Sequence, residues 1–107
     1  MPSNKIHLGD IGVVFRVTIN DIDQNGVEFA VDLSAATTQE FIFEKPDESQ
    51  FTVTTSFTTD GTDGQIQYIS VADDLDDVGN WCLQAHIIIP AGEFRSSIVR
   101  FPVEENL

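Results

Sequence analysis

The chain has 107 residues, with 18 Asp and Glu against 5 Lys and Arg, and a formal net charge of −13. A chain of this length predicts a single domain over residues 1–107. So negative a surface repels phosphate, which argues against nucleic acid and anionic membranes as partners. No stretch reaches the ~18 apolar residues that span a membrane. Cys82 is the only cysteine, so we expect no internal disulfide.

In the first half of the chain, apolar residues alternate with period two, which predicts β-strands. Residues 13–19 form the first such segment. Residues 27–33 form the second, with Val27, Phe29, Val31 and Leu33 on one face. Asn25-Gly26 lies between them and supplies the positive φ angles of a tight hairpin. Residues 37–45 are the third strand, followed by a turn at Pro46.

The second half continues the pattern. Residues 51–59 alternate apolar residues with threonine and serine, which predicts a strand with its Thr-lined face toward solvent. Residues 65–70 form a short strand after a Gly-rich turn. Residues 71–78 carry four Asp residues and predict a loop or one helical turn. Residues 80–89 and 94–103 form the last two strands, joined by a turn at Pro90-Ala91-Gly92.

These segments amount to about seven short strands with turn signals at roughly 8–12-residue spacing. This spacing is typical of a small antiparallel β-sandwich. Helix-length periodic segments are absent, which excludes a parallel α/β sheet. We therefore expect an all-β fold.

One motif points to an immunoglobulin-like sandwich. Asp77, Gly79, Trp81 and Leu83 follow the spacing Asp-x-Gly-x-aromatic-x-apolar, which marks the corner entering a late strand of immunoglobulin-type domains. The aromatic residue there is usually Tyr, and the apolar position is usually the disulfide Cys. Here Trp81 and Leu83 stand in those places, and Cys82 is out of phase with the pattern.

A wider resemblance extends from about Ile6 to Val103. Its elements are turn and strand motifs in a fixed order. They are Gly9-Asp10-Ile11-Gly12 with Phe15-Arg16-Val17, Val31-Asp32-Leu33-Ser34-Ala35-Ala36-Thr37, Phe43-Glu44-Lys45-Pro46-Asp47, Asp63-Gly64-Gln65-Ile66-Gln67-Tyr68, Gly79-Asn80-Trp81 and Gly92-Glu93-Phe94. In this order the chain resembles the immunoglobulin-like N-terminal domain of phage baseplate upper proteins and related tail or fibre proteins.

The resemblance implies a structural protein of a phage virion, made in the host bacterial cytoplasm. It implies a small tail or baseplate module that acts by binding other virion proteins and copies of itself. A capsid decoration protein on the phage head suits the size and acidity equally well. A calcium- or carbohydrate-binding adhesion module is an alternative of another class.

The calcium alternative depends on Asp21, Asp23, Asn25 and Asp32. Oxygen ligands at alternate positions, with Gly26 for the turn, resemble a calcium-loop template. Asp32 is shorter than the usual closing Glu, and the flanking segments are strands. A solvated hairpin tip explains the same residues, so we expect no metal and no cofactor.

Catalytic motifs are missing from the sequence. Ser34, Ser96 and Ser97 lack the Gly-x-Ser-x-Gly elbow of a hydrolase nucleophile. Cys82 and His86 would lie about 13 Å apart on one strand face, too far to share a zinc ion. We expect a binding protein and not an enzyme.

Three segments place apolar residues on both faces of a strand, which a sandwich strand with one solvated face does not need. A barrel-like twist, a bulge or a covering loop would explain this pattern, and so would a buried contact with a neighbouring protein, which we favour. We expect Ile42 and Ile88 at or near that interface. Its predicted residues also include Phe41, Phe43 and Ile98.

Overall fold

The computed structural model describes residues 6–107, and Met1–Lys5 of the predicted domain lie outside the described residues. The described chain contains only β-strands and connecting turns. No helix within residues 6–107 is long and apolar enough to cross a membrane. The strands are β1 (Ile6–His7), β2 (Val14–Thr18), β3 (Asn20–Ile22), β4 (Glu28–Ala30), β5 (Thr38–Glu44), β6 (Gln50–Thr54), β7 (Ser56–Phe57), β8 (Gln65–Ile69), β9 (Gly79–Ile89), β10 (Gly92–Arg95) and β11 (Val99–Glu104).

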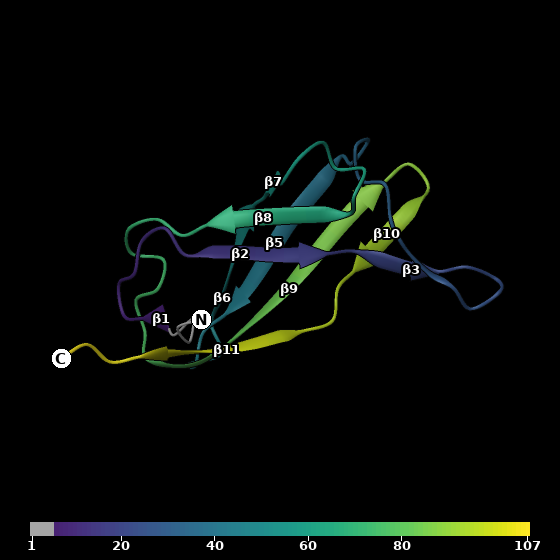
Figure 1. Cartoon of the computed structure of the whole chain (residues 1–107). Helices are drawn as coiled ribbons and strands as arrows, with labels where there is room; N and C mark the ends of the chain where they lie inside the picture. The colour runs from purple at the N-terminus through teal and green to yellow at the C-terminus, as the bar shows by residue number, and fades with distance from the viewer. Residues whose placement is uncertain (1–5) are drawn as a thin grey trace.

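The strands form two layers, as the sequence predicts. The larger sheet has the order β1-β11-β9-β5-β6, with β10 also paired to β9, and the smaller has the order β2-β8-β7. In Figure 1, β2 and β8 cross in front of β5 and β9. All pairings are antiparallel except that of β1 with β11. Two packed sheets without a helix within residues 6–107 confirm the predicted fold class at the level of a small all-β sandwich.

The core lies between the layers and is built from the inward positions of both sheets. Trp81, Leu83, Ala85 and Ile87 alternate along β9 and are buried, as predicted. Aromatic rings bridge the layers, since Phe15 of β2 lies 5.2 Å from Phe43 of β5 between ring centroids. Edge-to-face pairs of this kind stabilise a core beyond their buried area. The domain therefore holds together by aromatic packing, without a disulfide.

The predicted corner forms at the start of β9. Trp81 Nε1 donates a 3.0 Å hydrogen bond to the carbonyl oxygen of Asp77. A tyrosine corner makes the same kind of bond, from a side chain at the start of strand F to backbone a few residues upstream. Leu83 occupies the buried position two residues later, paired with Phe43 of β5. Trp81 and Leu83 thus take the buried aromatic and apolar positions that the Asp-x-Gly-x-aromatic-x-apolar motif predicts.

The predicted strand over residues 51–59 is two strands. β6 pairs with β5 in the larger sheet, whereas β7 pairs with β8 in the smaller sheet. The chain changes sheets at Thr55, which is buried. The alternation continues through the crossing, so Thr52, Thr54 and Ser56 are exposed as predicted.

The predicted strand over residues 94–103 is also interrupted. β10 and β11 pair with the same side of β9. Two residues lie between Leu83 and His86 on β9, whereas three lie between their partners Arg95 and Val99. The edge therefore carries one extra residue, a β-bulge. Ser96 Oγ accepts from the Ala85 backbone N–H at 2.9 Å, which replaces a ladder bond at this point.

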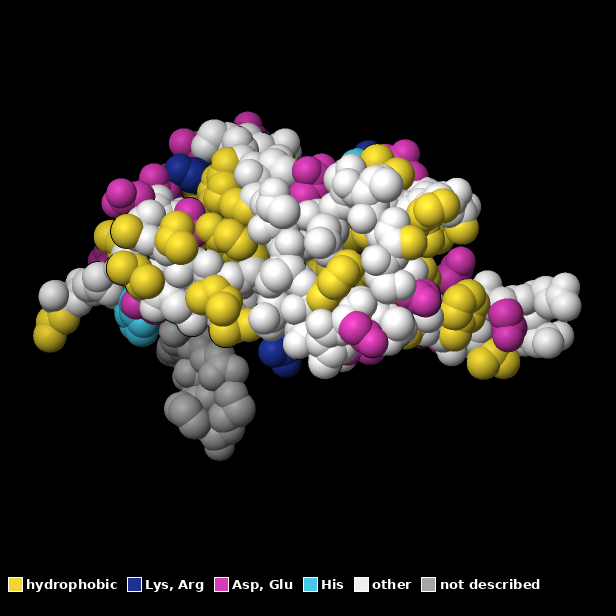
Figure 2. Space-filling view, turned by 90° about the horizontal axis from the view of Figure 1, so that it is seen from above, with side chains coloured by type: hydrophobic (Ala, Val, Ile, Leu, Met, Phe, Trp, Pro, Cys, Tyr) yellow, Lys and Arg dark blue, Asp and Glu magenta, His cyan; other side chains and the backbone are white. Residues whose placement is uncertain are grey.

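The predicted hairpin at Asn25-Gly26 is present but leaves the body of the domain. β3 and β4 form their own two-stranded sheet, and Gly26 has the expected positive φ of 81°. Figures 1 and 2 show this hairpin projecting beyond the two layers. Val31 and Leu33 are buried in the core, but Val27 and Phe29 on the predicted same face are exposed. The four residues alternate as predicted, but only Val31 and Leu33 reach the core, because the sandwich ends near Val31.

The segment over residues 71–78 is a loop. Leu75 seals the core from this loop and is 1% exposed, a role the sequence pattern does not indicate. Asp74 Oδ2 accepts from the Tyr68 hydroxyl at 2.6 Å and from the Val71 backbone N–H. Burial, together with this hydrogen bond, raises the pKa of Tyr68 to about 12. A second aspartate of the loop, Asp76, forms an ion pair with Lys45 at 2.8 Å. Two of the four loop aspartates, Asp74 and Asp76, thus contact other side chains of the domain.

Candidate protein-binding surfaces

Two of the predicted interface residues are core residues. Phe41 and Phe43 are 0% and 1% exposed and pack inside the sandwich. The prediction that they contact a partner is wrong, because the inward positions of β5 face the smaller sheet. Their apolar character is explained by the core alone.

The other three predicted residues lie on the outer face of the larger sheet or at its edge. Ile42 of β5 and Ile88 of β9 are half-buried outward positions. Ile98 is 49% exposed in the bulge between β10 and β11. Ile42 and Ile98 share a shallow hollow of about 80 Å³ beside Cys82 and Gln84. We name Ile42, Ile88 and Ile98 the outer apolar face.

A charged network lies on the same outer face, along the strand between Gln84 and Ile88. The His86 ring contacts two carboxylates: Nδ1 lies 2.9 Å from Glu40 of β5, and Nε2 contacts Glu93 of β10. Arg95 lies 3.6 Å from Glu93. An imidazolium can donate to both carboxylates at once, whereas a neutral ring can donate to only one. The geometry therefore favours the charged form of His86.

The pKa values follow this geometry. The hydrogen bond to Glu40, followed by that to Glu93, raises the pKa of His86 above its ordinary value of 6.5. The hydrogen bond from His86 lowers the pKa of Glu93 below its ordinary value of 4.5. Sequence reasoning missed this network because His86 and Glu40 are 46 residues apart. Only the strand register, in which His86 pairs with Glu40 on one side and Arg95 on the other, brings them together.

The predicted calcium ligands make local contacts. Asp23 Oδ1 accepts from the backbone N–H groups of Asn25 and Val27, closing the hairpin turn. Asp32 Oδ1 accepts from the Ser34 backbone N–H and hydroxyl, and these bonds lower the pKa of Asp32. Within residues 6–107, no group of three or more His, Cys, Asp or Glu side chains gathers in a metal-binding arrangement. The structure does not bring Asp21, Asp23 and Asp32 together.

A carbohydrate-binding module, the other alternative, would need an exposed aromatic ring, but Trp81 and Tyr68 pack in or against the core. Trp81 is fully buried, and Tyr68 is partly buried with its hydroxyl held by Asp74. Sugar sites usually expose an aromatic ring beside polar groups. Neither residue presents such a ring to solvent.

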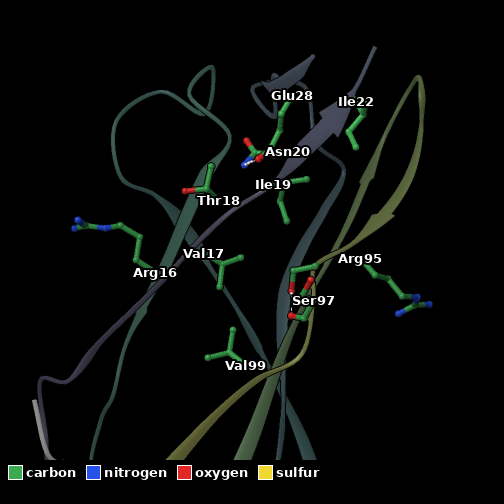
Figure 3. Close-up of a pocket in the computed structure, with 11 residues that line it drawn as sticks. Arg16, Val17, Thr18, Ile19, Asn20, Ile22, Glu28, Arg95, Ser97 and Val99 are labelled. Atoms are coloured by element: carbon green, nitrogen blue, oxygen red, sulfur yellow. Dashed lines mark hydrogen bonds between the residues drawn. The ribbon is translucent and has the colours of Figure 1, made fainter. Parts of the chain in front are cut away.

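A hollow lies at one side of the sandwich. It measures about 510 Å³ and is open to solvent. Val17, Ile19 and Val99 point into it in Figure 3, while Arg16 and Arg95 extend at either side. We name this hollow the edge groove. Its lining residues are Arg16, Val17, Thr18, Ile19, Asn20, Ile22, Glu28, Arg95, Ser96, Ser97 and Val99.

The edge groove lies between two strand edges. β2 pairs only with β8, and β10 pairs only with β9, so each has a side without a partner strand within residues 6–107. Unpaired edges expose backbone N–H and C=O groups that can accept a further strand. Sequence reasoning missed the groove because its lining comes from three separate segments, around residues 16–22, 28 and 95–99. The sequence indicates only the adjoining β3–β4 hairpin, through its turn at Asn25-Gly26.

Comparison of the chain with protein-family models, with curated proteins and with solved structures found no match.

Proposed function

We propose that the chain is a small structural module of a phage virion, in the tail or baseplate, which acts by protein–protein binding. The virion setting depends on the sequence resemblance between residues 6 and 103. The binding role is supported by one structural observation: Ile42 and Ile98 of the outer apolar face line one shallow hollow, and half-buried Ile88 lies further along β9. Apolar side chains that reach the surface of a sheet favour an interface with another protein.

The neighbouring charges give this face an orientation for docking. Glu40, His86 and Arg95 lie between Ile88 and the hollow beside Ile42, and Glu93 lies opposite Ile88. A fixed pattern of charge beside apolar side chains selects partners by electrostatic complementarity. The net charge of −13 favours basic docking surfaces on other virion proteins, with an association rate that falls as salt rises.

Immunogold labelling of purified phage particles with antibodies against the chain tests the proposal. We expect gold particles at the tail or its baseplate, with a phage lacking the gene as the control. Label on the head would favour the capsid decoration alternative. A chain absent from purified particles, by labelling and by mass spectrometry, would contradict a virion role.

A further inference from the structure

The β3–β4 hairpin has no cover within the described chain. All residues from Asn20 to Ala30 are exposed, so both faces of this two-stranded sheet meet solvent. Ile22, Val27 and Phe29 are 64%, 58% and 46% exposed. An isolated two-stranded hairpin is marginally stable in water, and stability normally comes from a third strand or a packed face. The hairpin therefore lacks a packing partner.

The edge groove offers a surface of the matching kind at the base of the same hairpin. Its floor is apolar, formed by Val17, Ile19 and Val99, and its sides are the open edges of β2 and β10. Ile22 and Glu28 of the hairpin themselves line it. An apolar hairpin face can fill such a groove, and its strands can pair with the open edges.

The charges of the two surfaces are complementary. The hairpin carries Asp21, Asp23 and Glu28 and has no Lys or Arg between residues 20 and 30. Arg16 and Arg95 are exposed at the two sides of the edge groove. Arg16 hydrogen-bonds the neutral amide of Gln67, and Arg95 lies 3.6 Å from Glu93. The edge groove is therefore flanked by two basic side chains, whereas the charged side chains of the hairpin are all acidic.

We propose that the occupant is a second copy of this chain, with each hairpin packed in the edge groove of the other molecule. Hairpin and groove adjoin on one molecule, so a single two-fold axis brings both pairs of surfaces together. Self-complementary patches of this kind produce closed dimers. This dimer deepens the proposed function, since it supplies the contact between copies that an assembly module makes. The outer apolar face stays free for other virion proteins.

Sedimentation velocity on the full chain, over a concentration series, tests the dimer. We expect wild type to dimerise and its dissociation constant to rise with salt. Phe29→Ser removes an exposed apolar contact and Arg95→Glu reverses a groove charge; each should weaken the dimer by about tenfold or more. Arg100→Glu is the matched control, because Arg100 is exposed on β11 outside the groove. Circular dichroism confirms that each variant is folded.

A mixing experiment identifies the surfaces. Asp21→Lys and Arg95→Glu should each be largely monomeric alone. Mixed together they should form a heterodimer, because one of its two contacts is native and the other has both charges exchanged. Hydrogen exchange should slow at residues 21–30 on dimerisation.

Three results would overturn the inference. A wild-type chain that stays monomeric up to high micromolar concentration excludes a second copy as occupant and leaves an acidic strand of another protein. A dimer that survives Phe29→Ser and Arg95→Glu but is lost in Ile88→Asp uses the outer apolar face instead. Failure of the mixed variants to associate excludes the charge pairing. None of these results depends on the immunogold outcome, so this inference and the virion role can fail separately.

Discussion

His86 is surrounded by charge in a way that makes the stability of the domain depend on pH. Its raised pKa means that the folded state holds a proton that the unfolded state loses near 6.5. The contribution of His86 is therefore complete below about 6.5 and disappears as pH rises through the folded-state pKa. The lowered pKa of Glu93 acts in the opposite direction, contributing above its ordinary 4.5 and disappearing as pH falls.

We expect Glu40→Gln to lower the pKa of His86, because it removes the carboxylate that accepts from Nδ1. NMR titration of the His86 ring measures this directly. The stability difference between wild type and Glu40→Gln, from urea unfolding, should be largest between pH 4.5 and 6.5 and shrink above that range. Glu105→Gln, at the exposed C-terminal end, is the control. An unchanged His86 midpoint in Glu40→Gln would contradict the network.

Thr55 gives a second prediction for a single residue. Its hydroxyl is buried where the chain changes sheets and has no hydrogen-bond partner within residues 6–107. A buried hydroxyl without a partner costs stability that an isosteric methyl group recovers. We expect Thr55→Val to raise the free energy of unfolding by about 1 kcal/mol. Thr58→Val is the control and should lower it, because the Thr58 hydroxyl bonds Gln65 at 3.1 Å. Equal losses in both variants would show that Thr55 is bonded after all.

The junction between the hairpin and the sandwich leaves no room for a side chain at Gly64. Gly64 has a φ of 74°, and its carbonyl oxygen accepts from the Ile19 backbone N–H at 2.8 Å. A Cβ at Gly64 would lie 2.8 Å from the carbonyl oxygen of Ile19 and 3.1 Å from that of Val31. Gly26, at the hairpin tip, has a similar φ of 81° but open space around it.

These two glycines separate backbone strain from steric conflict. We expect Gly26→Ala to cost about 1 kcal/mol, since only the left-handed conformation is penalised. Gly64→Ala should cost about 3 kcal/mol, because the methyl group also displaces backbone. Urea unfolding of both variants measures the difference. Equal costs would mean that the backbone around Gly64 moves aside for the methyl group with no further loss of stability. They would contradict a steric constraint at this junction.

The positions of the main strands can be predicted from the sequence, but the points at which two of them are interrupted cannot. Period-two alternation located the segments around β2, β5, β8 and β9, and the Asp-x-Gly-x-aromatic spacing located the corner at Trp81. The same alternation continues through Thr55 and changes little at Ser96. It therefore gives no sign that the chain changes sheets at Thr55 or that a bulge follows β10 at Ser96. Both interruptions depend on which strand lies alongside, and that information is absent from local periodicity.

For the whole molecule, the outer apolar face carries the prediction about assembly. We expect Ile88→Asp to abolish association with virion partners while the isolated domain stays folded, because Ile88 is an outward, half-buried position. Incorporation of the variant into particles, with circular dichroism as the folding check, measures this. Val71→Asp, at an exposed apolar residue in the loop after β8, is the control. Unchanged incorporation of Ile88→Asp would exclude this face as the docking surface.

The acidic charge also has its main effect at the level of the molecule. Its aspartates gather in turns and loops, where several bond nearby backbone or hydroxyl groups, as Asp32, Asp47 and Asp60 do. This leaves the core between the sheets apolar and makes the charge a property of the rim. Arg16 and Arg95 flank the edge groove and give this site a positive charge that the acidic rim lacks. An acidic surface is therefore attracted to the groove.

The sequence by itself determined the all-β class, the alternation that selects the core, and the corner at Trp81, because these follow from periodicities of a few residues. Only the tertiary structure decided that Phe41 and Phe43 are core and not interface. It also decided that Glu40, His86 and Glu93 meet, and that the hairpin projects beside a groove. Each of these depends on the pairing of strands far apart in the chain. Such pairing is set by how two sheets share one core and not by any neighbouring residues.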